Sequence, residues 1–324
     1  MTKIGVVVIG RNEGERLRRC LESVRGSAAI MVYVDSGSTD GSVDLARSLG
    51  AEVVELDMRM PFTAARARNT GFQRLIELMP ELAYAQLVDG DCELHPEWIG
   101  QALAYLDAHP GVAMLCGRLR ERFPEHSVYN RLCDMEWDTP IGETKACGGI
   151  AMVRADAFGQ ARGFRSDLIA GEEPELGIRL RANGWRIWRI DAEMAWHDAA
   201  MFRFGQWWKR SVRAGYAFAE GAHLHGRAPE RHWVRESISA WIWGLAIPLV
   251  ATLTVIWAGW SGMAVLAIYP LQILRLSLRS RGAGGAAGWR AVFLILGKFP
   301  ELIGQLKFMW RLVSGGRLQI IEYK

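Results

Sequence analysis

Apolar residues in the first part of the chain come in short unbroken runs, separated by stretches with helical spacing. Unbroken runs rich in β-branched residues are typical of strands buried on both faces of a parallel sheet. The pattern predicts strands over residues 4–9, 30–34, 52–56, 83–88 and 186–190, and helices over residues 15–24, 43–49 and 63–79. This alternation predicts a doubly wound, mostly parallel α/β sheet whose ligand lies at the carboxyl ends of the strands.

The pattern changes after about residue 230. No charged side chain occurs from Ser237 to Leu274, a run too long for an ordinary buried helix. We expect a transmembrane hairpin over about residues 238–278, with a tight turn at Gly259-Trp260-Ser261-Gly262. The alternative is a buried helical pair in a soluble fold.

Charges flank this hairpin on both sides. The flanking arginines are Arg231, Arg235, Arg275, Arg279 and Arg281. Positive residues stay preferentially in the cytoplasm, so both ends of the hairpin are expected there. Residues 282–288 suggest a linker, and residues 289–313, apolar but interrupted by charges, suggest an interfacial amphipathic helix. The expected organisation is a cytoplasmic catalytic domain over residues 1–230 and a membrane region over residues 231–324, at the cytoplasmic membrane.

Composition excludes several other classes of protein. The 324 residues carry a formal net charge of only +4, and no basic block with interleaved aromatics occurs before the apolar region, so nucleic acid is not an expected partner. The five cysteines are odd in number and show no C-x-x-C spacing. Neither a disulfide framework nor a zinc knuckle is indicated, which fits a reducing cytosol.

Two carboxylates follow the strand predicted over residues 83–88. Asp89 and Asp91 bracket Gly90, and at the end of a buried strand each can give one oxygen to a hard divalent cation such as Mg²⁺ or Mn²⁺. Such an ion would neutralise the charge on a leaving nucleoside diphosphate. The alternative is a pair of solvated acidic residues.

A second acidic segment, Gly171-Glu172-Glu173-Pro174-Glu175, precedes a predicted helix that ends at Asn183-Gly184. Pro174 suits the first helical position, which makes Glu173 the N-cap. Because glutamate is a mediocre cap, Glu173 is a candidate general base. The helix dipole favours its ionised form, whereas Glu172, Glu175 and a bound diphosphate would raise its pKa. An acidic first turn that only complements the dipole is the alternative.

The order of these features matches a known family. The matching segments are Val8-Ile9-Gly10-Arg11-Asn12-Glu13, Val34-Asp35-Ser36-Gly37-Ser38-Thr39-Asp40-Gly41-Ser42, Ala67-Arg68-Asn69-Thr70-Gly71, Asp89-Gly90-Asp91, Gly148-Gly149 and Gly171-Glu172-Glu173-Pro174-Glu175-Leu176. Over roughly its first two-thirds the chain resembles a family 2 glycosyltransferase of GT-A fold, of the membrane-associated bacterial type. The ordered set is far more specific than any one segment.

The resemblance implies a role for each matching residue. Asp35 would read the uracil edge, helped by Ile9, Glu13 and the backbone near Arg11, because a carboxylate accepts the imide N–H. Arg68 would approach the ribose or diphosphate. Asp91 would hold the metal, with Asp89 against the ribose or metal and His197 completing the metal site. Gly148 and Gly149 would admit the donor or acceptor, with Glu172 and Arg210 nearby.

Several of these residues also have a purely structural interpretation. Asp35 could cap the helix near Ser42, Arg68 could be a surface charge, and His197 could be structural. The segment Gln206-Trp207-Trp208-Lys209-Arg210 is similar to the Q-x-x-R-W element of processive polysaccharide synthases, but Ser211 stands in place of the tryptophan. Lys209, Arg210 and Arg213 could instead bind lipid phosphates or solvate a helix face.

The resulting hypothesis is an inverting, metal-dependent transfer of a single sugar. The donor would be a nucleotide sugar, expected to be a UDP-sugar, and the acceptor a hydroxyl of a lipid-linked glycan in surface polysaccharide assembly. The departure of Glu173 from the aspartate common in the family leaves the reach of the base open. A processive membrane synthase and a non-catalytic nucleotide-binding scaffold are the two alternatives.

Overall fold

The computed structural model describes residues 3–279 and 286–315, which fall into two compact units. Unit 1 consists of the chain up to Pro124 together with Cys133–Ala200, and unit 2 consists of Glu125–Leu132 together with the chain from Met201 onwards. The main division between these units therefore falls at residue 200, while the expected boundary of the catalytic domain at residue 230 stays a prediction. The reason is that the helix over residues 204–225 packs against the C-terminal helices.

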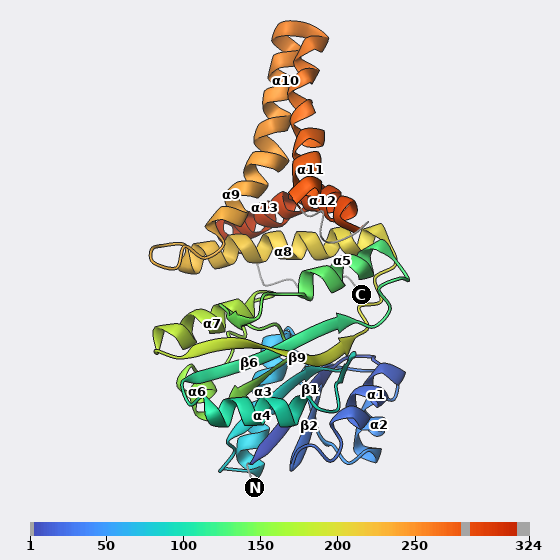
Figure 1. The fold of residues 1–324 in the computed structure, drawn as a ribbon, viewed down its shortest axis with the longest axis vertical. Helices are drawn as coiled ribbons and strands as arrows, with labels where there is room; N and C mark the ends of the chain where they lie inside the picture. Colours follow the sequence, from blue (N-terminus) through green and yellow to red (C-terminus); the bar gives the residue numbers. More distant parts are fainter. Residues whose placement is uncertain (1–2, 280–285, 316–324) are drawn as a thin grey trace. The chain divides into compact units, whose positions relative to one another are not determined.

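Unit 1 alternates strands and helices (Figure 1). Its first half contains β1 (Ile4–Gly10), α1 (Glu15–Val24), β2 (Ile30–Asp35), α2 (Ser42–Ser48), β3 (Glu52–Glu55), α3 (Ala64–Leu78) and β4 (Tyr84–Asp89). Its second half contains β5 (Cys92–Leu94), α4 (Trp98–Ala108), β6 (Val112–Glu121), the end of α5 (Val128–Trp137), β7 (Gly142–Glu143), β8 (Ala151–Arg154), α6 (Ala155–Gln160), α7 (Glu172–Ala182) and β9 (Arg186–His197). The elements predicted in the first half are all present.

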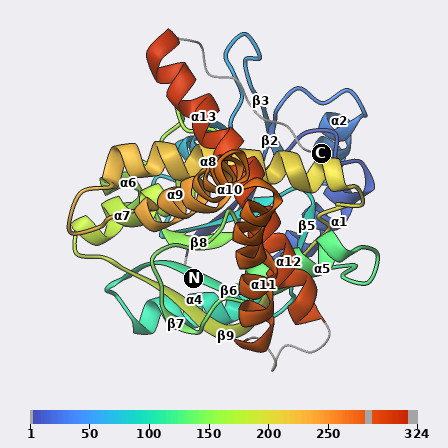
Figure 2. The same cartoon turned by 90° about the horizontal axis from the view of Figure 1, so that it is seen from above.

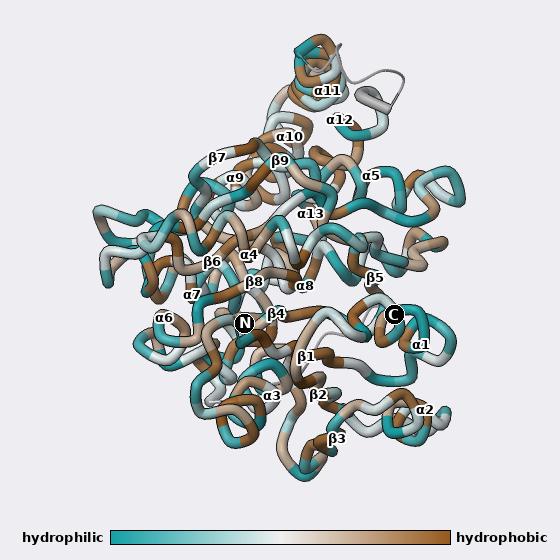
Figure 3. The backbone as a smooth tube through the Cα atoms, turned by 60° about the horizontal axis from the view of Figure 1, so that its bottom comes forward, coloured by the Kyte–Doolittle hydropathy of each residue, from teal (hydrophilic) through white to brown (hydrophobic). Residues whose placement is uncertain are grey.

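The strands of the described residues form one sheet in the order β3-β2-β1-β4-β8-β6-β9-β5, with β7 paired to β9. The β3-β2-β1-β4 part is parallel, as predicted. The rest is mixed, because β8 runs antiparallel to both β4 and β6. Strand β1 consists of apolar residues and glycine, and β4 is mostly apolar but contains the buried Gln86; the tube of Figure 3 is coloured by this hydropathy. Ile9 lies opposite Asp89 in the β1–β4 register, so the loops that follow these two strands begin side by side.

Unit 2 is helical. Its elements are α8 (Phe204–His225), α9 (Val234–Trp241), a π-helical turn (Ile242–Ala246), α10 (Ile247–Ala258), a 3₁₀ helix (Gly259–Ala267), α11 (Ile268–Arg279), α12 (Ala286–Leu296) and α13 (Lys298–Ser314). Helix α13 crosses α8 (Figure 2). A β-carbon added to Gly215 would lie 2.0 Å from the Glu301 carbonyl oxygen, and one added to Gly304 would lie 2.0 Å from the Val212 carbonyl oxygen. The two helices therefore pack backbone to backbone.

Helices α10 and α11 form a hairpin within unit 2 (Figure 1). The chain reverses at Gly259, whose φ of 68° is unfavourable for residues with a side chain. The Tyr269 hydroxyl donates to the Trp243 carbonyl, which ties the two arms together. Large apolar side chains cover the outside, including Ile256, Trp257 and Trp260 at 77, 90 and 84% exposure. By length and composition, Val234–Arg279 can cross a membrane, with only 11% of its most apolar window buried.

The region after the hairpin differs from the single helix expected over residues 289–313. Helix α12 ends at Leu296, Gly297 forms a turn, and α13 begins at Lys298. Proline in the first turn of α13 is compatible with a helix start but not with a continuous helix through it. Of the expected linker, residues 282–285 lie outside the described residues, as does Arg281, and residues 286–288 already belong to α12.

Candidate active site

Asp35, the last residue of β2, is buried and holds the loop that follows it. Its Oδ2 accepts from the backbone N–H groups of Gly37 and Ser38 at 2.9 and 2.8 Å. Its Oδ1 accepts from the Tyr33 hydroxyl at 3.0 Å. A carboxylate offers about four acceptor positions, so about one is left for a ligand.

The loops after β1 and β2 are bonded to each other through Asn12. Its backbone N–H donates to Ser38 Oγ at 2.9 Å, and its Oδ1 accepts from the Thr39 N–H at 2.7 Å. Asp40 completes the connection, with Oδ2 accepting from the Gly14 N–H and Oδ1 from the Ser42 N–H. The N-cap of α2 is Gly41, without a side-chain cap bond, and the Asp35 carboxylate bonds to the loop before the helix rather than to the helix itself.

The residues expected to contact the nucleoside from the β1 side lie at the end of β1 or in the loop that follows it. Ile9 is buried at the end of β1, and Glu13 forms an ion pair with Arg16 at 2.8 Å. The Arg11 guanidinium lies 4.9 Å from the centre of the Phe62 ring. Gly90 lets the Glu13 side chain approach the turn after β4, because a β-carbon added to Gly90 would lie only 3.3 Å from Glu13 Cγ. The loop after β1 and the turn after β4 thus form one packed edge.

Helix α3 carries three residues with distinct tasks. Gly71 lets the helix approach the sheet, because an added β-carbon would lie 2.3 Å from Val7 Cγ1. Asn69 holds the loop that leads to α7: its Nδ2 donates to the Phe164 carbonyl at 2.7 Å, and its Oδ1 accepts from the Phe164 N–H at 2.9 Å. Arg68 points into the site. The segment Ala67-Arg68-Asn69-Thr70-Gly71 therefore joins the sheet, the loop before α7 and the candidate site.

Arg68 binds three carboxylates rather than standing free for a diphosphate. Nη2 donates to Asp89 Oδ1 at 2.8 Å, and Nη1 donates to Glu172 Oε1 at 3.0 Å and to Glu173 Oε1 at 3.3 Å. The Arg68 side chain is only 3% exposed, so it is not a surface charge. We refer to Asp89, Glu172 and Glu173 around Arg68 as the carboxylate cluster. A planar guanidinium suits this task because its donors are fixed in direction.

The two glycines before β8 differ sharply. A β-carbon on Gly149 would lie 2.0 Å from Arg68 Nη2 and 3.1 Å from Asp89 Oδ2, whereas on Gly148 it would meet no described atom within 4 Å. The close approach that Gly149 permits is therefore to Arg68 and Asp89 of the protein itself. The expectation that Gly148 and Gly149 let the donor or acceptor approach closely stays a prediction.

Glu173 lies in the first turn of α7, two positions deeper than predicted. The helix begins at Glu172 with Gly171 as N-cap, whose φ is 83°, so Glu173 is the second helical residue and Pro174 the third. Glu175 pairs with Arg179 at 2.6 Å and does not join the cluster. Burial, then the neighbouring Glu172, raises the pKa of Glu173 to about 7, although Arg68 opposes this. A carboxylate that ionises near neutrality suits a general base.

The second aspartate of the pair lies beside His197. Asp91 Oδ2 is 3.2 Å from His197 Nε2, as the resemblance implied. Cys92 joins them: its thiol donates to Asp91 Oδ1 at 3.5 Å, and ligand atoms of Asp91, Cys92 and His197 all lie within 4.8 Å of one another. The Trp137 ring stacks on His197 at 4.6 Å. Sequence reasoning missed Cys92, although it follows Asp91 directly, and nothing in the local sequence marks Trp137.

The residues beside His197 fit a divalent cation. A carboxylate oxygen and an imidazole nitrogen are ligands that Mn²⁺ and Mg²⁺ accept, Mn²⁺ more readily because of the nitrogen. Asp89 is bonded to Arg68 and is not part of the ligand group found among the described residues. The donor set of Asp91 and His197 therefore fits a metal without requiring Asp89.

Arg210 lies on α8 in unit 2, whereas the carboxylate cluster belongs to unit 1. Gln206 is accounted for by local structure, because its side-chain oxygen accepts from the backbone N–H groups of Phe202 and Arg203 at the start of α8. Trp207 is buried against Phe293, with ring centres 4.8 Å apart. Helix capping and core packing thus explain much of the segment that is similar to Q-x-x-R-W.

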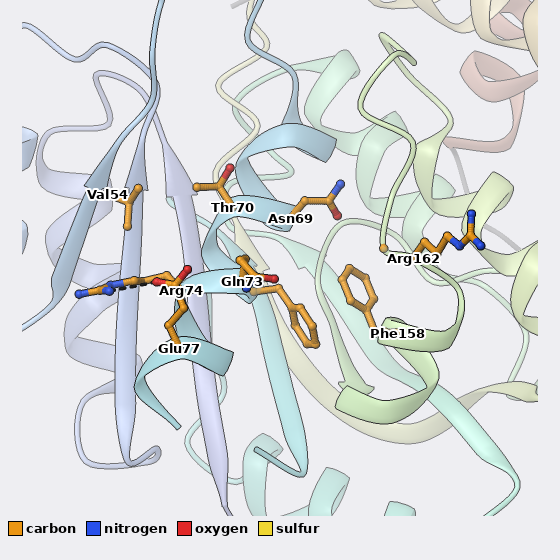
Figure 4. A pocket seen from close by; sticks show the side chains of 11 residues that line it. Val54, Asn69, Thr70, Gln73, Arg74, Glu77, Phe158 and Arg162 are labelled. Atoms are coloured by element: carbon orange, nitrogen blue, oxygen red, sulfur yellow. Dashed lines mark hydrogen bonds and ion pairs between the residues drawn. The ribbon is translucent and has the colours of Figure 1, made fainter. Parts of the chain in front are cut away.

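A separate cavity of about 600 Å³ lies beside α3 (Figure 4). It is lined by Asn69, Thr70, Gln73, Arg74 and Glu77 of α3 and by Phe158 and Arg162. This is a different face of α3 from the one that places Gly71 against the sheet. None of the candidate site residues predicted from the sequence lines it.

Comparison with known proteins identifies the family of this chain. Residues 5–205 match the family described as glycosyl transferase family 2. Since the match covers more than half of the chain, this protein belongs to that family.

The chain is similar to several known proteins. It superimposes on the mannosyltransferase PcManGT from Pyrobaculum calidifontis, solved in complex with GDP-Man and Mn²⁺, with a TM-score of 0.60 and 18% identity over 95% of this chain and 87% of that one. This likeness establishes a shared fold. The succinoglycan biosynthesis protein ExoA from Rhizobium meliloti (strain 1021) is 26% identical over 204 residues, 57% of this chain and 60% of the relative.

A shorter similarity involves an uncharacterized glycosyltransferase of Rickettsia bellii (strain RML369-C). It is 46% identical over 52 residues, which make up 16% of this chain and 18% of that protein. The chain thus spans less than two thirds of the length of these curated relatives.

Proposed function

We propose that this protein is an inverting, metal-dependent glycosyltransferase that moves one sugar from a nucleotide sugar to a hydroxyl of a lipid-linked acceptor. The observation that carries the proposal is the carboxylate cluster. Arg68 bonds at the same time to Asp89, at the end of β4, and to Glu173, in the first turn of α7. Asp89, which we expect on the donor side of the site, and the candidate base Glu173 therefore bond to the same guanidinium group.

Glu173 would act as the base. As the acceptor oxygen bonds to the anomeric carbon, Glu173 takes the hydroxyl proton and the bond from that carbon to the diphosphate breaks, which inverts the configuration. Arg68 has two effects on this step. It fixes the direction of the Glu173 carboxylate, and it holds Glu172 and Glu173 close together despite their like charge.

Asp91 and His197 would hold a divalent cation, Mn²⁺ or Mg²⁺. When bound, that ion supplies positive charge to the leaving diphosphate. The residues of the chain orient the other parts of the donor. Asp35 and the loop at Arg11 would contact the nucleobase of the donor, and Glu13 would stabilise that loop. We expect a UDP-sugar, and the GDP-Man complex of PcManGT makes GDP-sugars the first alternative.

The hairpin of unit 2 supports a membrane location. Its exposed apolar surface would be unfavourable in water but is compatible with hydrocarbon. With both ends of the hairpin in the cytoplasm, the catalytic unit would face a cytoplasmic supply of nucleotide sugar. A lipid-linked glycan, such as a polyprenyl diphosphate carrier in surface polysaccharide assembly, would then meet the site at the membrane surface.

The test is nucleotide release by the detergent-purified full chain. UDP-sugars and GDP-sugars are supplied one at a time with Mn²⁺ or Mg²⁺ and a membrane lipid extract. Asp91→Ala and Glu173→Gln are compared with Glu97→Ala, a change of an exposed acid at the start of α4. We expect release that requires metal and lipid extract, and that both site variants abolish while Glu97→Ala keeps it.

Other results would point elsewhere. Polymer formed without a lipid primer would indicate a processive synthase. Nucleotide binding without release from any sugar donor would indicate a scaffold that has kept only the pocket. Release that persists in Glu173→Gln would remove Glu173 from the role of base.

A further inference from the structure

The group formed by Asp91, Cys92 and His197 contains a ligand that a site for Mg²⁺ or Mn²⁺ does not need. Hard cations of this kind prefer oxygen ligands and accept imidazole, whereas thiolate selects Zn²⁺, Co²⁺ or Cd²⁺. A buried cysteine is usually a small apolar side chain. Cys92 differs from an ordinary buried cysteine because its sulfur lies among two other ligand atoms, all within 4.8 Å of one another.

The pairing of strands β5 and β9 positions the Cys92 sulfur beside His197. Cys92 lies directly opposite His197 in the antiparallel β5–β9 pair. Side chains directly opposite each other project from the same face of a sheet, so sulfur and imidazole converge. Asp91 immediately precedes β5, and its two oxygens meet the Cys92 thiol and the His197 ring separately, at 3.5 and 3.2 Å. The convergence thus follows from strand register and not from one flexible side chain.

The dimensions suit coordination after a small contraction. Metal bonds of about 2.0 to 2.3 Å in tetrahedral geometry put ligand atoms roughly 3.3 to 3.8 Å apart. The two short separations, 3.2 Å to His197 Nε2 and 3.5 Å to Cys92 Sγ, are made by different oxygens of Asp91, and the ligand atoms, one from each residue, all lie within 4.8 Å of one another. The stacked Trp137 ring fixes one face of the His197 imidazole. The three residues supply one sulfur, one nitrogen and one oxygen, with the fourth position open to water or a phosphate oxygen.

We propose that Asp91, Cys92 and His197 bind a thiophilic divalent cation, with Cys92 as a sulfur ligand, at the position where the proposed transfer uses Mn²⁺ or Mg²⁺. The sulfur–metal bond forms as the thiol proton passes to solvent. Such an ion would compete with the hard cation for Asp91 and His197. Zinc would therefore inhibit the enzyme. The competition rests on the proposed function, whereas the binding itself does not.

Cobalt gives a direct readout of the sulfur ligand. Co²⁺ is titrated into the detergent-purified full chain under a thiol-free reductant, and absorbance is followed for the sulfur-to-cobalt charge-transfer band in the near ultraviolet. We expect this band in the unmodified protein and its loss in Cys92→Ser, together with at least a tenfold weaker Co²⁺ affinity. Cys20→Ser is the matched control, because Cys20 is also buried and its thiol donates to the Asp89 carbonyl at 3.6 Å. It should keep the band.

The unmodified protein alone can overturn the proposal, so it does not depend on whether a variant folds. Saturating Co²⁺ that produces no charge-transfer band would show that Cys92 is not a ligand. A band that survives in Cys92→Ser but disappears in Cys20→Ser would assign the sulfur elsewhere. Neither result depends on sugar transfer, so either is distinguishable from a failure of the proposed function, which nucleotide release with Mn²⁺ reports separately.

Discussion

Arg68 and Asp89 form an ion pair, with Nη2 2.8 Å from Oδ1, at the carboxyl end of β4, where the arginine is buried and the aspartate side chain is 31% exposed. The other terminal nitrogen of the same guanidinium binds Glu172 and Glu173 from α7. One arginine therefore connects the strand that carries the aspartate pair with the helix that carries the candidate base. A substitution that displaces Asp89 should therefore also affect the first turn of α7, and the reverse, because both bond to Arg68.

Replacing Arg68 with methionine should destabilise the protein by about 3 to 5 kcal/mol, because three carboxylates lose a buried counter-charge. Arg68 opposes the rise in the pKa of Glu173, so without Arg68 the pKa of Glu173 rises further above its unfolded value. The loss of stability should therefore be largest at about pH 8 and shrink toward about pH 5, as Glu173 takes up a proton. Thermal unfolding of the two proteins at both pH values measures this.

The control for that experiment is Arg74→Met on the same helix. Arg74 pairs with Glu52 and Glu77 but is 36% exposed, and exposed ion pairs contribute about 0 to 1 kcal/mol. An equal loss in the two variants would contradict a special role for the carboxylate cluster.

Gly149→Ala should lower the turnover number on the order of 100-fold, whereas Gly148→Ala should change it little. The added methyl at position 149 would lie 2.0 Å from Arg68 Nη2 and must displace it, while at position 148 it meets no described atom within 4 Å. Displacement by about 1 Å at a catalytic site costs about this much. Steady-state nucleotide release at saturating donor compares the pair. Similar rates in the two variants would show that the position of Arg68 does not matter.

The rate of transfer should fall below about pH 7. The pKa of Glu173 is raised to about 7 by burial and by Glu172, so the base becomes protonated as the pH drops through that value. We expect the turnover number to decline roughly tenfold for each further pH unit and to level off above the pKa. A pH profile that stays flat down to about pH 5 would be inconsistent with a base of raised pKa.

Asn69→Ala should loosen the loop that leads into α7. The change removes both bonds to the Phe164 backbone and leaves polar groups unsatisfied, at a cost of about 1 to 3 kcal/mol. We expect a lower unfolding temperature and a lower turnover number with little change in donor affinity, since Glu173 loses its support. Gln73→Ala, one turn further along α3 and facing the cavity, is the control and should preserve both.

Leu249→Arg should reduce membrane integration. Leu249 is exposed near the middle of the first arm of the hairpin, which runs from about residue 238 to Ala258, and a charge at the centre of a spanning helix costs about 2.5 to 3.5 kcal/mol. Cell fractionation and extraction with alkaline carbonate measure the change. Leu278→Arg, beside Arg279 at the end of α11, should remain integrated because its charge can reach the head groups. Full integration of both variants would argue against a spanning hairpin.

The sequence predicted the parallel half of the sheet well. Its strands are buried runs and its helices are amphipathic, so local pattern is enough, and α1 has the bounds that were expected. The segment between Asp91 and Gly171 was not assigned, because its short and mixed strands depend on partners distant in sequence. Strand β8, for example, is fixed by antiparallel contacts with β4 and β6.

The sequence by itself determined the α/β class, the family, the apolar hairpin and which carboxylates to suspect, since these follow from composition, order and period. Tertiary structure alone decided that Arg68 serves three carboxylates, that Gly149 makes room for it, and that Cys92 meets His197. These relationships join residues on different strands and helices. They arise from register and packing, and no local pattern encodes which side chains a folded sheet brings together.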